Sequence, residues 1–101
     1  MMSVRSDVLR VLADPLRARI VELLARESLC TCHLVEETGA SQTNVSNHLR
    51  SLREAGLVSA EPAGRYTYYR LNAEAVRTLA ASLSALADIA DVQAETRRPC
   101  Q

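Results

Sequence analysis

The feature that most constrains the fold is a change in the spacing of apolar residues at Gly56. Before this glycine, apolar residues recur every three or four positions, as they do on one face of an α-helix. After it, the segments 57–61 and 65–71 alternate in character around the Pro-Ala-Gly of 62–64, which predicts a β-hairpin. Helical spacing returns after Asn72. The sequence therefore predicts helices on both sides of one short hairpin.

The chain before the hairpin is expected to contain two helices and then a helical pair. Asp14 and Pro15 are typical of an N-cap and a first helical position, so they separate a first helix from a second. Ser28 is a plausible cap for a third helix over 29–38. Apolar residues at helical spacing mark the inner face of the first two helices: Val4, Val8, Val11, Leu12, Leu16, Ile20, Leu23 and Leu24.

The helical pair is joined by a short turn that contains a glycine. Gly39 ends the third helix because glycine tolerates the left-handed conformation after a last turn, and Ser41 caps a fourth helix over 42–55. Helix, short turn and helix is the helix-turn-helix layout. With the hairpin behind it, the expected fold class is mainly α with a small β-hairpin. It is a winged helix-turn-helix of four helices, two strands and a last helix over 73–95.

Length and apolar patterning predict one domain and a partner subunit. A chain of 101 residues buries only a modest fraction of its surface. Residues 1–95 are expected to form the DNA-binding and dimerisation domain, and residues 96–101 a flexible C-terminal tail. The first and last helices keep long apolar stripes, which predicts a two-fold homodimer through these helices.

The fourth helix has one apolar and one polar side. Val45, Leu49 and Leu52 fall on the core side by their spacing. The polar side carries short or planar side chains that can reach base edges and phosphates in a major groove, although a merely solvated face is the plainer interpretation. Against that interpretation, lysine is absent from the chain and glutamate is absent from this helix before Glu54, whereas exposed helix faces are usually richer in both. The predicted DNA contacts are Gln42, Thr43, Ser46, Asn47, Arg50 and Arg65.

Local charge supports this assignment. The whole chain is neutral, with 12 basic and 12 acidic residues, whereas residues 41–70 hold four arginines and two glutamates, a net charge of plus two. Phosphate contacts supply much of the affinity of DNA-binding proteins. Arg65, at the expected hairpin tip, is the candidate for a wing contact. The hairpin tyrosines, Tyr66, Tyr68 and Tyr69, are expected to pack the sheet on the helices rather than to stack on bases.

Composition argues against membrane proteins, disulfide scaffolds and thiol enzymes. No apolar run is long enough to cross a bilayer, so a cytoplasmic protein with reduced thiols is expected. Three cysteines are too few and odd in number for a disulfide scaffold. A thiol reductase or isomerase would need a Cys-x-x-Cys pair on a strand–helix scaffold, which this chain lacks. The chain is therefore not expected to be an enzyme.

The cysteines are the candidate reactive or metal-binding residues. Cys30 and Cys32 are either small buried apolar residues or metal ligands, and at this spacing on a helix one of them must face away from the core. Cys100 is either a third ligand, from the same chain or across a dimer, or a free thiol in the tail. His33 is either a surface residue or a ligand to a borderline divalent ion.

These residues together resemble the ArsR/SmtB family of metal-sensing repressors, closest to the arsenic-responsive type. The similarity covers roughly residues 5–95 and depends on the cysteine pair, on the segment SQTNVSNHLRSLREAGLV and on the wing segment GRYTYYRL. It implies a dimeric repressor that binds a palindromic double-stranded operator without a cofactor and leaves it when metal binds. It also supports Gln42, Thr43, Ser46 and Asn47 as groove-facing residues, and Arg65 as a wing residue.

The resemblance also implies the class of inducer. In this family a Cys-x-Cys at the start of the third helix marks sensors of As(III), Sb(III), Cd(II) or Pb(II), and here it corresponds to Cys30 and Cys32. Some arsenic sensors have a further cysteine where this chain has Val35, and the last helix lacks the histidines of zinc-type sites. As(III) or Sb(III) is the expected inducer. A repressor that responds to Cd(II), Pb(II) or thiol oxidation is the alternative.

The expected mechanism depends on helix geometry. Residues two apart on a regular helix point about 200° away from each other. Cys30 and Cys32 are therefore expected to share an ion only if the first turn of the third helix distorts, and this distortion would change the DNA-binding geometry. A disulfide between them is expected to be strained.

Overall fold

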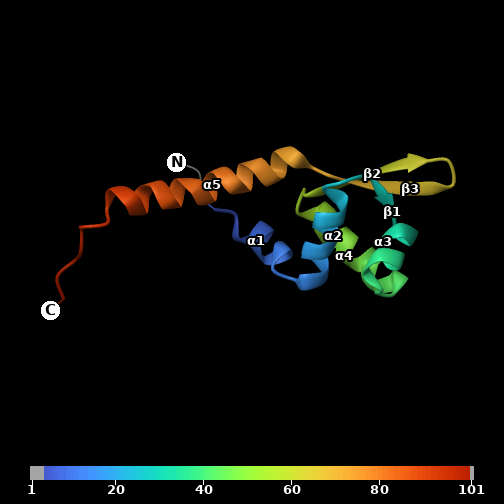
Figure 1. Ribbon diagram of the computed structural model, residues 1–101, viewed down its shortest axis with the longest axis horizontal. Coiled ribbons are helices and arrows are strands. Elements are labelled where there is room, and N and C mark those ends of the chain that lie inside the picture. Colours follow the sequence, from blue (N-terminus) through green and yellow to red (C-terminus); the bar gives the residue numbers. More distant parts are fainter. Residues whose placement is uncertain (1–3, 101) are drawn as a thin grey trace.

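The computed structural model describes residues 4–100 and has the element order of a winged helix-turn-helix (Figure 1). The expected fold class is confirmed, with one additional short strand. The helices are α1 (Ser6–Leu12), α2 (Pro15–Leu24), α3 (Thr31–Thr38), α4 (Gln42–Glu54) and α5 (Ala73–Val92). The strands are β1 (Leu29–Cys30), β2 (Val58–Ala63) and β3 (Tyr66–Leu71).

Three helices begin at the N-caps that the sequence indicates. The Asp14 carboxylate accepts the backbone N–H groups of Leu16 and Arg17 at 2.9 and 3.0 Å. The Ser41 hydroxyl accepts the N–H of Asn44 at 3.1 Å, and the Asn72 side chain caps α5. The hydrogen bond from the Arg17 backbone is the main reason that the pKa of Asp14 lies below its ordinary value. Local capping chemistry thus fixes three of the helix starts.

The strand β1 is a feature that the sequence did not reveal. It pairs antiparallel with β3, Leu29 opposite Tyr69 and Cys30 opposite Tyr68, so the sheet has the order β1-β3-β2. Two residues are too few to show an alternating pattern, and the pairing joins segments far apart in the chain. The third helix therefore begins at Thr31 with Cys30 as its N-cap, and the expectation that Ser28 caps it is wrong.

The wing is the hairpin of β2 and β3. Its register runs from Val58 opposite Leu71 to Ala63 opposite Tyr66. Pro62 lies inside β2, which is an edge strand, where a residue without an N–H is tolerated. Gly64 takes a φ of 63° in the turn, a conformation that glycine adopts without strain. The hairpin is thus confirmed, with β2 longer than predicted.

The core lies between α1, α2, α3, α4 and the base of the sheet. Val45, Leu49 and Leu52 of α4 are buried, as their spacing predicts. Tyr69 packs against this core, but the residue Tyr66 is 59% exposed, so the expectation that all three tyrosines pack inward is wrong for Tyr66. The other fully buried large side chains are Ile20, Leu34 and Leu57.

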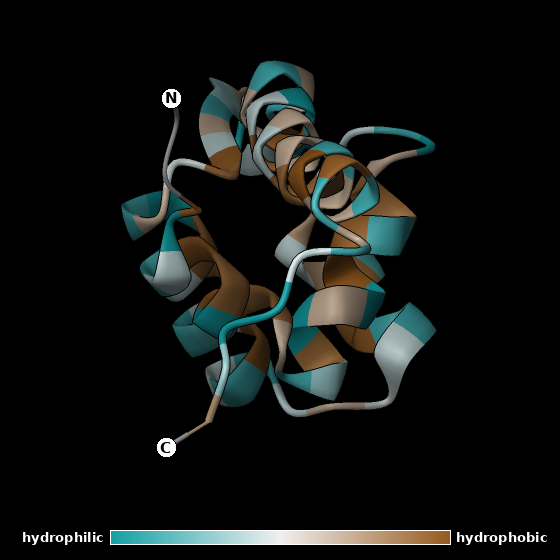
Figure 2. Ribbon diagram, turned by 90° about the vertical axis from the view of Figure 1, so that its left-hand side faces the viewer, coloured by the Kyte–Doolittle hydropathy of each residue, from teal (hydrophilic) through white to brown (hydrophobic). Residues whose placement is uncertain are grey.

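Helix α5 differs from the others because much of its apolar side has no cover. It ends at Val92, three residues before the predicted end, and extends away from the other helices along the 63 Å long axis (Figure 1). Figure 2 shows hydrophobic residues on α5 as well as between the helices of the core. Leu83, Leu86 and Ile89 are 42%, 54% and 43% exposed. Over the described residues, no helix is long and apolar enough to cross a membrane.

Candidate metal site and nucleic-acid interface

Cys30 and Cys32 lie at the junction of β1 and α3. Cys30 ends the strand in an extended conformation, with φ −87° and ψ 169°, and Cys32 is the second residue of the helix. The two residues are therefore not both helical. The rotation of about 200° between residues two apart on a regular helix does not hold for them. The expectation that their sulfurs meet only if the helix distorts is wrong, because α3 is regular from Thr31 onward.

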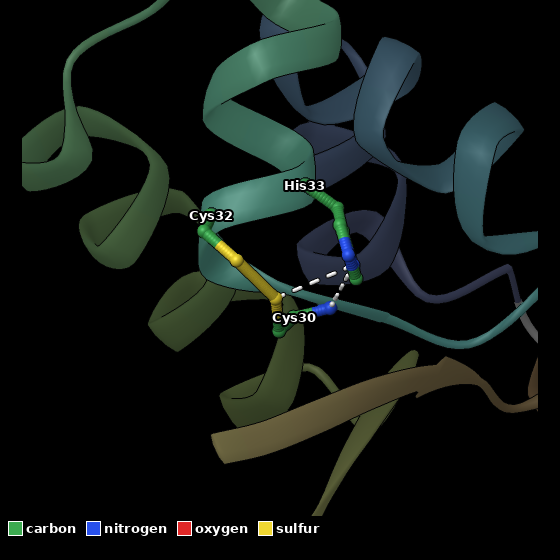
Figure 3. The surroundings of a disulfide bond; sticks show 3 residues. All are labelled: Cys30, Cys32 and His33. Atoms are coloured by element: carbon green, nitrogen blue, oxygen red, sulfur yellow. Dashed lines mark hydrogen bonds between the residues drawn. A yellow bond between two sulfur atoms is a disulfide. The ribbon is translucent and has the colours of Figure 1, made fainter. Parts of the chain in front are cut away.

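The two sulfurs are in direct contact. The structure joins them in a disulfide bond across a Cα–Cα distance of 5.5 Å, within the usual range for bridged cysteines (Figure 3). Cys30 is buried, with 4% of its surface exposed, whereas Cys32 is exposed. The junction thus places one sulfur at the surface, that of Cys32, in contact with one in the core, that of Cys30.

His33 completes this cluster. Its Nδ1 accepts the backbone N–H of Cys30 at 3.2 Å and lies 3.3 Å from the Cys30 sulfur (Figure 3). The potential ligand atoms of Cys30, Cys32 and His33 all lie within 4.8 Å of one another. Two sulfurs and an imidazole nitrogen are a donor set suited to soft or borderline metal ions. The structure therefore places His33 beside the cysteine pair, a position that the sequence alone did not indicate.

The cluster is connected to the wing. Cys30 pairs with Tyr68 of β3, and the His33 ring lies against the Tyr68 ring with centroids 6.2 Å apart. Because β3 is the middle strand, it links the cysteine junction on one side to β2 on the other. Cys30 and the hairpin are therefore parts of one hydrogen-bonded sheet.

Cys100 is not brought to this cluster by its own chain. It is exposed and free, in the segment that follows α5. Figure 1 shows the C-terminal end and the α3–β1 region at opposite ends of the long axis. Within one chain, the structure groups Cys30 and Cys32 and separates them from Cys100.

The polar side of α4 is open to solvent along its length. The five predicted contacts on this helix are all exposed, whereas the opposite side is buried in the core. Gly39, in the left-handed conformation at φ 74°, makes the turn that sets α4 against α3. The exposed residues are Gln42, Thr43, Ser46, Asn47 and Arg50. Their placement has the form of a recognition helix.

Arginines surround the wing and the end of α4. Arg65 is exposed in the hairpin turn beside Gly64. Arg50 and Arg53 line a depression between α4 and β2, together with Glu54 and with Ser59 of that strand. These guanidinium groups supply the positive charge that phosphate binding needs.

The signal that would have identified His33 lies in the residue spacing. A helix whose N-cap is followed three residues later by a side chain that reaches back to the N-cap N–H is a capping box. Here Cys30 and His33 take the positions that serine and glutamate commonly fill. The pattern was recognisable only once Cys30, and not Ser28, was known to be the N-cap.

Comparison with known proteins places the chain in a family. Residues 14–60 match the family model described as bacterial regulatory protein, arsR family. The arsenic resistance transcriptional regulator ArsR1 of Pseudomonas putida is 42% identical over 82 residues, which cover 80% of this chain and 64% of that protein. The arsenical resistance operon repressor of Bacillus subtilis is 39% identical, over 69% of this chain and 68% of that protein. The match thus spans about two thirds of these relatives.

Solved structures agree with the sequence matches. The crystal structure of a possible transcriptional regulator for arsenical resistance has a TM-score of 0.73 at 34% identity, covering 91% of this chain and 98% of that one. A homodimeric winged helix-turn-helix DNA-binding domain from Mycobacterium bovis has a TM-score of 0.68 at 26% identity, covering 93% and 86%. Sequence and fold agree, and the chain belongs to the arsR family of bacterial regulatory proteins, which are DNA-binding regulators and not enzymes.

Proposed function

We propose that this protein is a metal-responsive transcriptional repressor. As a homodimer without metal it binds a palindromic double-stranded operator, and it leaves the operator when As(III) or Sb(III) binds the thiolates of Cys30 and Cys32. Residues 1–95 act as the DNA-binding and dimerisation domain in the cytoplasm, and residues 96–101 as a flexible tail. The observation that carries the proposal is the contact between the two cysteine sulfurs at the β1–α3 junction.

The junction is well placed to control DNA binding. On one side, α3 leads through the Gly39 turn into α4, which carries the predicted groove contacts. On the other side, β1 pairs with β3 of the wing. An ion held by the two sulfurs would therefore act on both DNA-contacting elements through one displaced residue, Cys30. This replaces helix distortion as the expected coupling.

The dimer is expected to form through α1 and α5. The exposed apolar residues of α5 need a cover that one chain does not provide. The homodimeric Mycobacterium bovis domain, which has the same fold, supports a second copy as that cover. Two recognition helices related by a two-fold axis would then read half-sites about one helical turn apart.

As(III) favours three sulfur ligands, and the β1–α3 junction supplies two. Cys100 of the second copy, or a small exogenous thiol, would supply the third. In either case the reduced dithiol is the form that binds, and its thiol protons are released to solvent.

A thiol-redox repressor is the second candidate, and one observation favours it. The structure joins Cys30 and Cys32 in a disulfide, so the fold permits this bond without loss of α3. In that mechanism the two thiols give two electrons and two protons to a peroxide, which is reduced. The disulfide form would then have the weaker affinity for the operator.

The two mechanisms separate in a single binding experiment. An operator fragment selected from random DNA by the reduced protein is titrated by fluorescence anisotropy, alone and with As(III), Sb(III), Cd(II), Pb(II) or peroxide. Allosteric coupling of about 1–3 kcal/mol corresponds to roughly 5–150-fold weaker DNA binding. As(III) or Sb(III) is expected to give this loss, in the wild type and in Arg97→Ala, which changes a distant tail arginine. Unchanged affinity with every metal, and a loss with peroxide only, would replace metal sensing by redox sensing.

A further inference from the structure

The imidazole of His33 has two neighbours that compete for it. Its Nδ1 accepts the Cys30 N–H at 3.2 Å, and the same nitrogen lies 3.3 Å from the Cys30 sulfur. The Cys32 sulfur lies within 4.8 Å of the other two ligand atoms. His33 therefore both caps α3 and stands among the sulfurs that would hold an ion.

We propose that His33 is the third protein ligand for a divalent ion, such as Cd(II), Zn(II) or Co(II), bound by the thiolates of Cys30 and Cys32. This inference rests on the proposed function only in that the reduced cysteine pair binds metal. As(III) would use the two sulfurs without His33. The site would thus hold two classes of ion with different sets of ligands.

The chemistry of the donor set supports this division. Tetrahedral zinc and cadmium sites commonly combine thiolate and imidazole ligands, and Cys₂His sites keep a fourth position open. As(III) forms a pyramid of three sulfurs and gains little from a nitrogen. Cys32 is exposed to solvent, so a water molecule can supply the fourth ligand of such a site.

Binding of a divalent ion would also break the hydrogen bond from the Cys30 N–H to His33 at the start of α3. A neutral imidazole has a single lone pair in the plane of its ring. If either ring nitrogen binds the ion, that lone pair is used, and Nδ1 can no longer accept the Cys30 N–H. Divalent ions would therefore release the N–H of Cys30, whereas As(III) would leave the hydrogen bond in place.

The matched variants are His33→Gln and His33→Ala. Glutamine at this position of a capping box still reaches the N-cap N–H, so His33→Gln keeps the cap while it removes the imidazole. His33→Ala removes both. Circular dichroism of the reduced metal-free proteins verifies that each variant folds before any metal is added.

The probes are Co(II), Cd(II) and As(III), each added alone to reduced protein without DNA. Co(II) binding is followed by the thiolate charge-transfer and ligand-field bands. We expect the affinity for Co(II) and Cd(II) to fall at least about 10–100-fold in both variants, the loss known for altering even the partners of metal ligands. As(III) affinity is expected to be unchanged in His33→Gln.

A direct readout keeps the test independent of affinity. With a spin-active cadmium isotope, a scalar coupling between the ion and an imidazole nitrogen of His33 is expected in the wild-type NMR spectrum. Wild-type Cd(II) spectra without this coupling, or full Co(II) affinity in His33→Gln, would overturn the proposal. Since no DNA is present, failure of operator release would leave this result unaffected.

Discussion

The N-termini of α3 and α4 both begin at a capping residue, but the side chains at the two caps differ in chemical reactivity. Helix α4 begins at Ser41, whose hydroxyl accepts the Asn44 N–H. Helix α3 begins with Cys30, and its N–H is held by His33, so thiol and imidazole replace the usual oxygen. The predicted recognition helix α4 thus begins at an unreactive N-cap. Helix α3 begins at a cysteine whose thiol can bind metal or be oxidised.

If the cysteine pair binds metal as proposed, a helix-turn-helix would gain a sensor without a new pocket. The two helices are joined by the Gly39–Ser41 turn and share one core. Under the proposed function, a change of residue type at one helix start would be enough to make that start respond to metal.

The largest effect is expected where the two helices are alike, in their shared core. Leu34 of α3 and Leu49 of α4 are 0% and 1% exposed. Leu34→Ala and Leu49→Ala should each lower the free energy of unfolding by about 2–5 kcal/mol, through lost transfer energy and the cavity left behind. Urea denaturation measures this loss. Thr43→Ala on the exposed side of α4 is the control, expected within about 0.5 kcal/mol. A small cost at only one leucine would mean that the helices do not share a core.

The next effect should appear only at the α3 end. Cys30→Ser and Cys32→Ser are expected to abolish the roughly 5–150-fold loss of operator affinity caused by As(III), because the paired sulfurs lie at that end. DNA binding by the metal-free protein should remain. Fluorescence anisotropy with and without As(III) measures both quantities.

The controls for this experiment lie outside the pair. Ser41→Ala alters the inert cap and should keep the full As(III) response. Cys100→Ser decides whether the tail cysteine is a ligand: an equal loss for all three cysteine variants would support a three-sulfur site across the dimer. A full response in Cys30→Ser would contradict the assignment of the sensor.

A smaller effect is expected at the α4 end. Ser41→Ala removes the hydroxyl that accepts the Asn44 N–H and should cost about 1 kcal/mol of stability. Thermal unfolding of reduced protein measures the cost, with Ser41→Asp as the variant that keeps a capping oxygen. The loss of stability caused by Ser41→Ala should be the same with and without Cd(II), since the cap of α4 contains none of the proposed metal ligands. A cost that depends on metal would show that the two caps are not independent.

The smallest effect concerns a third cap, that of α2. The backbone N–H of Arg17 holds the pKa of Asp14 below its ordinary value, with the nearby His48 as a further cause. A lowered folded-state pKa means that the stabilisation is complete above the unfolded-state value and is lost as the pH falls through the folded-state value. Asp14→Asn retains a capping oxygen and removes this titration. Wild type and variant should therefore differ in the pH dependence of urea unfolding below about pH 4, and the same pH dependence in both proteins there would contradict this.

Features fixed by neighbouring residues were the ones that the sequence predicted well. Gly39 and Ser41 define the turn and the start of α4 by local chemistry alone, so the helix-turn-helix was recognisable. The alternation after Gly56 depends on period two, which also survives without tertiary context. Both predictions are confirmed by the bounds of α4, β2 and β3.

The cysteine junction could not be predicted in the same way. The two residues of β1 become a strand only because β3, some forty residues later, pairs with them. Without that strand, Cys30 falls inside the predicted helix, and the angle between the two thiols comes out wrong. The role of His33 follows from the same error, since it depends on Cys30 being the N-cap. Non-local pairing thus decided the geometry of the candidate site.

The exposed apolar side of α5 makes the state of the protein depend on its concentration in the cell. If a second copy must shield Leu83, Leu86 and Ile89, folding and pairing become one equilibrium whose midpoint moves with protein concentration. A cell that makes only a few copies would then hold unpaired chains, exposed to proteases and unable to span an operator. The amount of repressor in the cell, and not only the amount of metal, would set the threshold at which the gene is switched on.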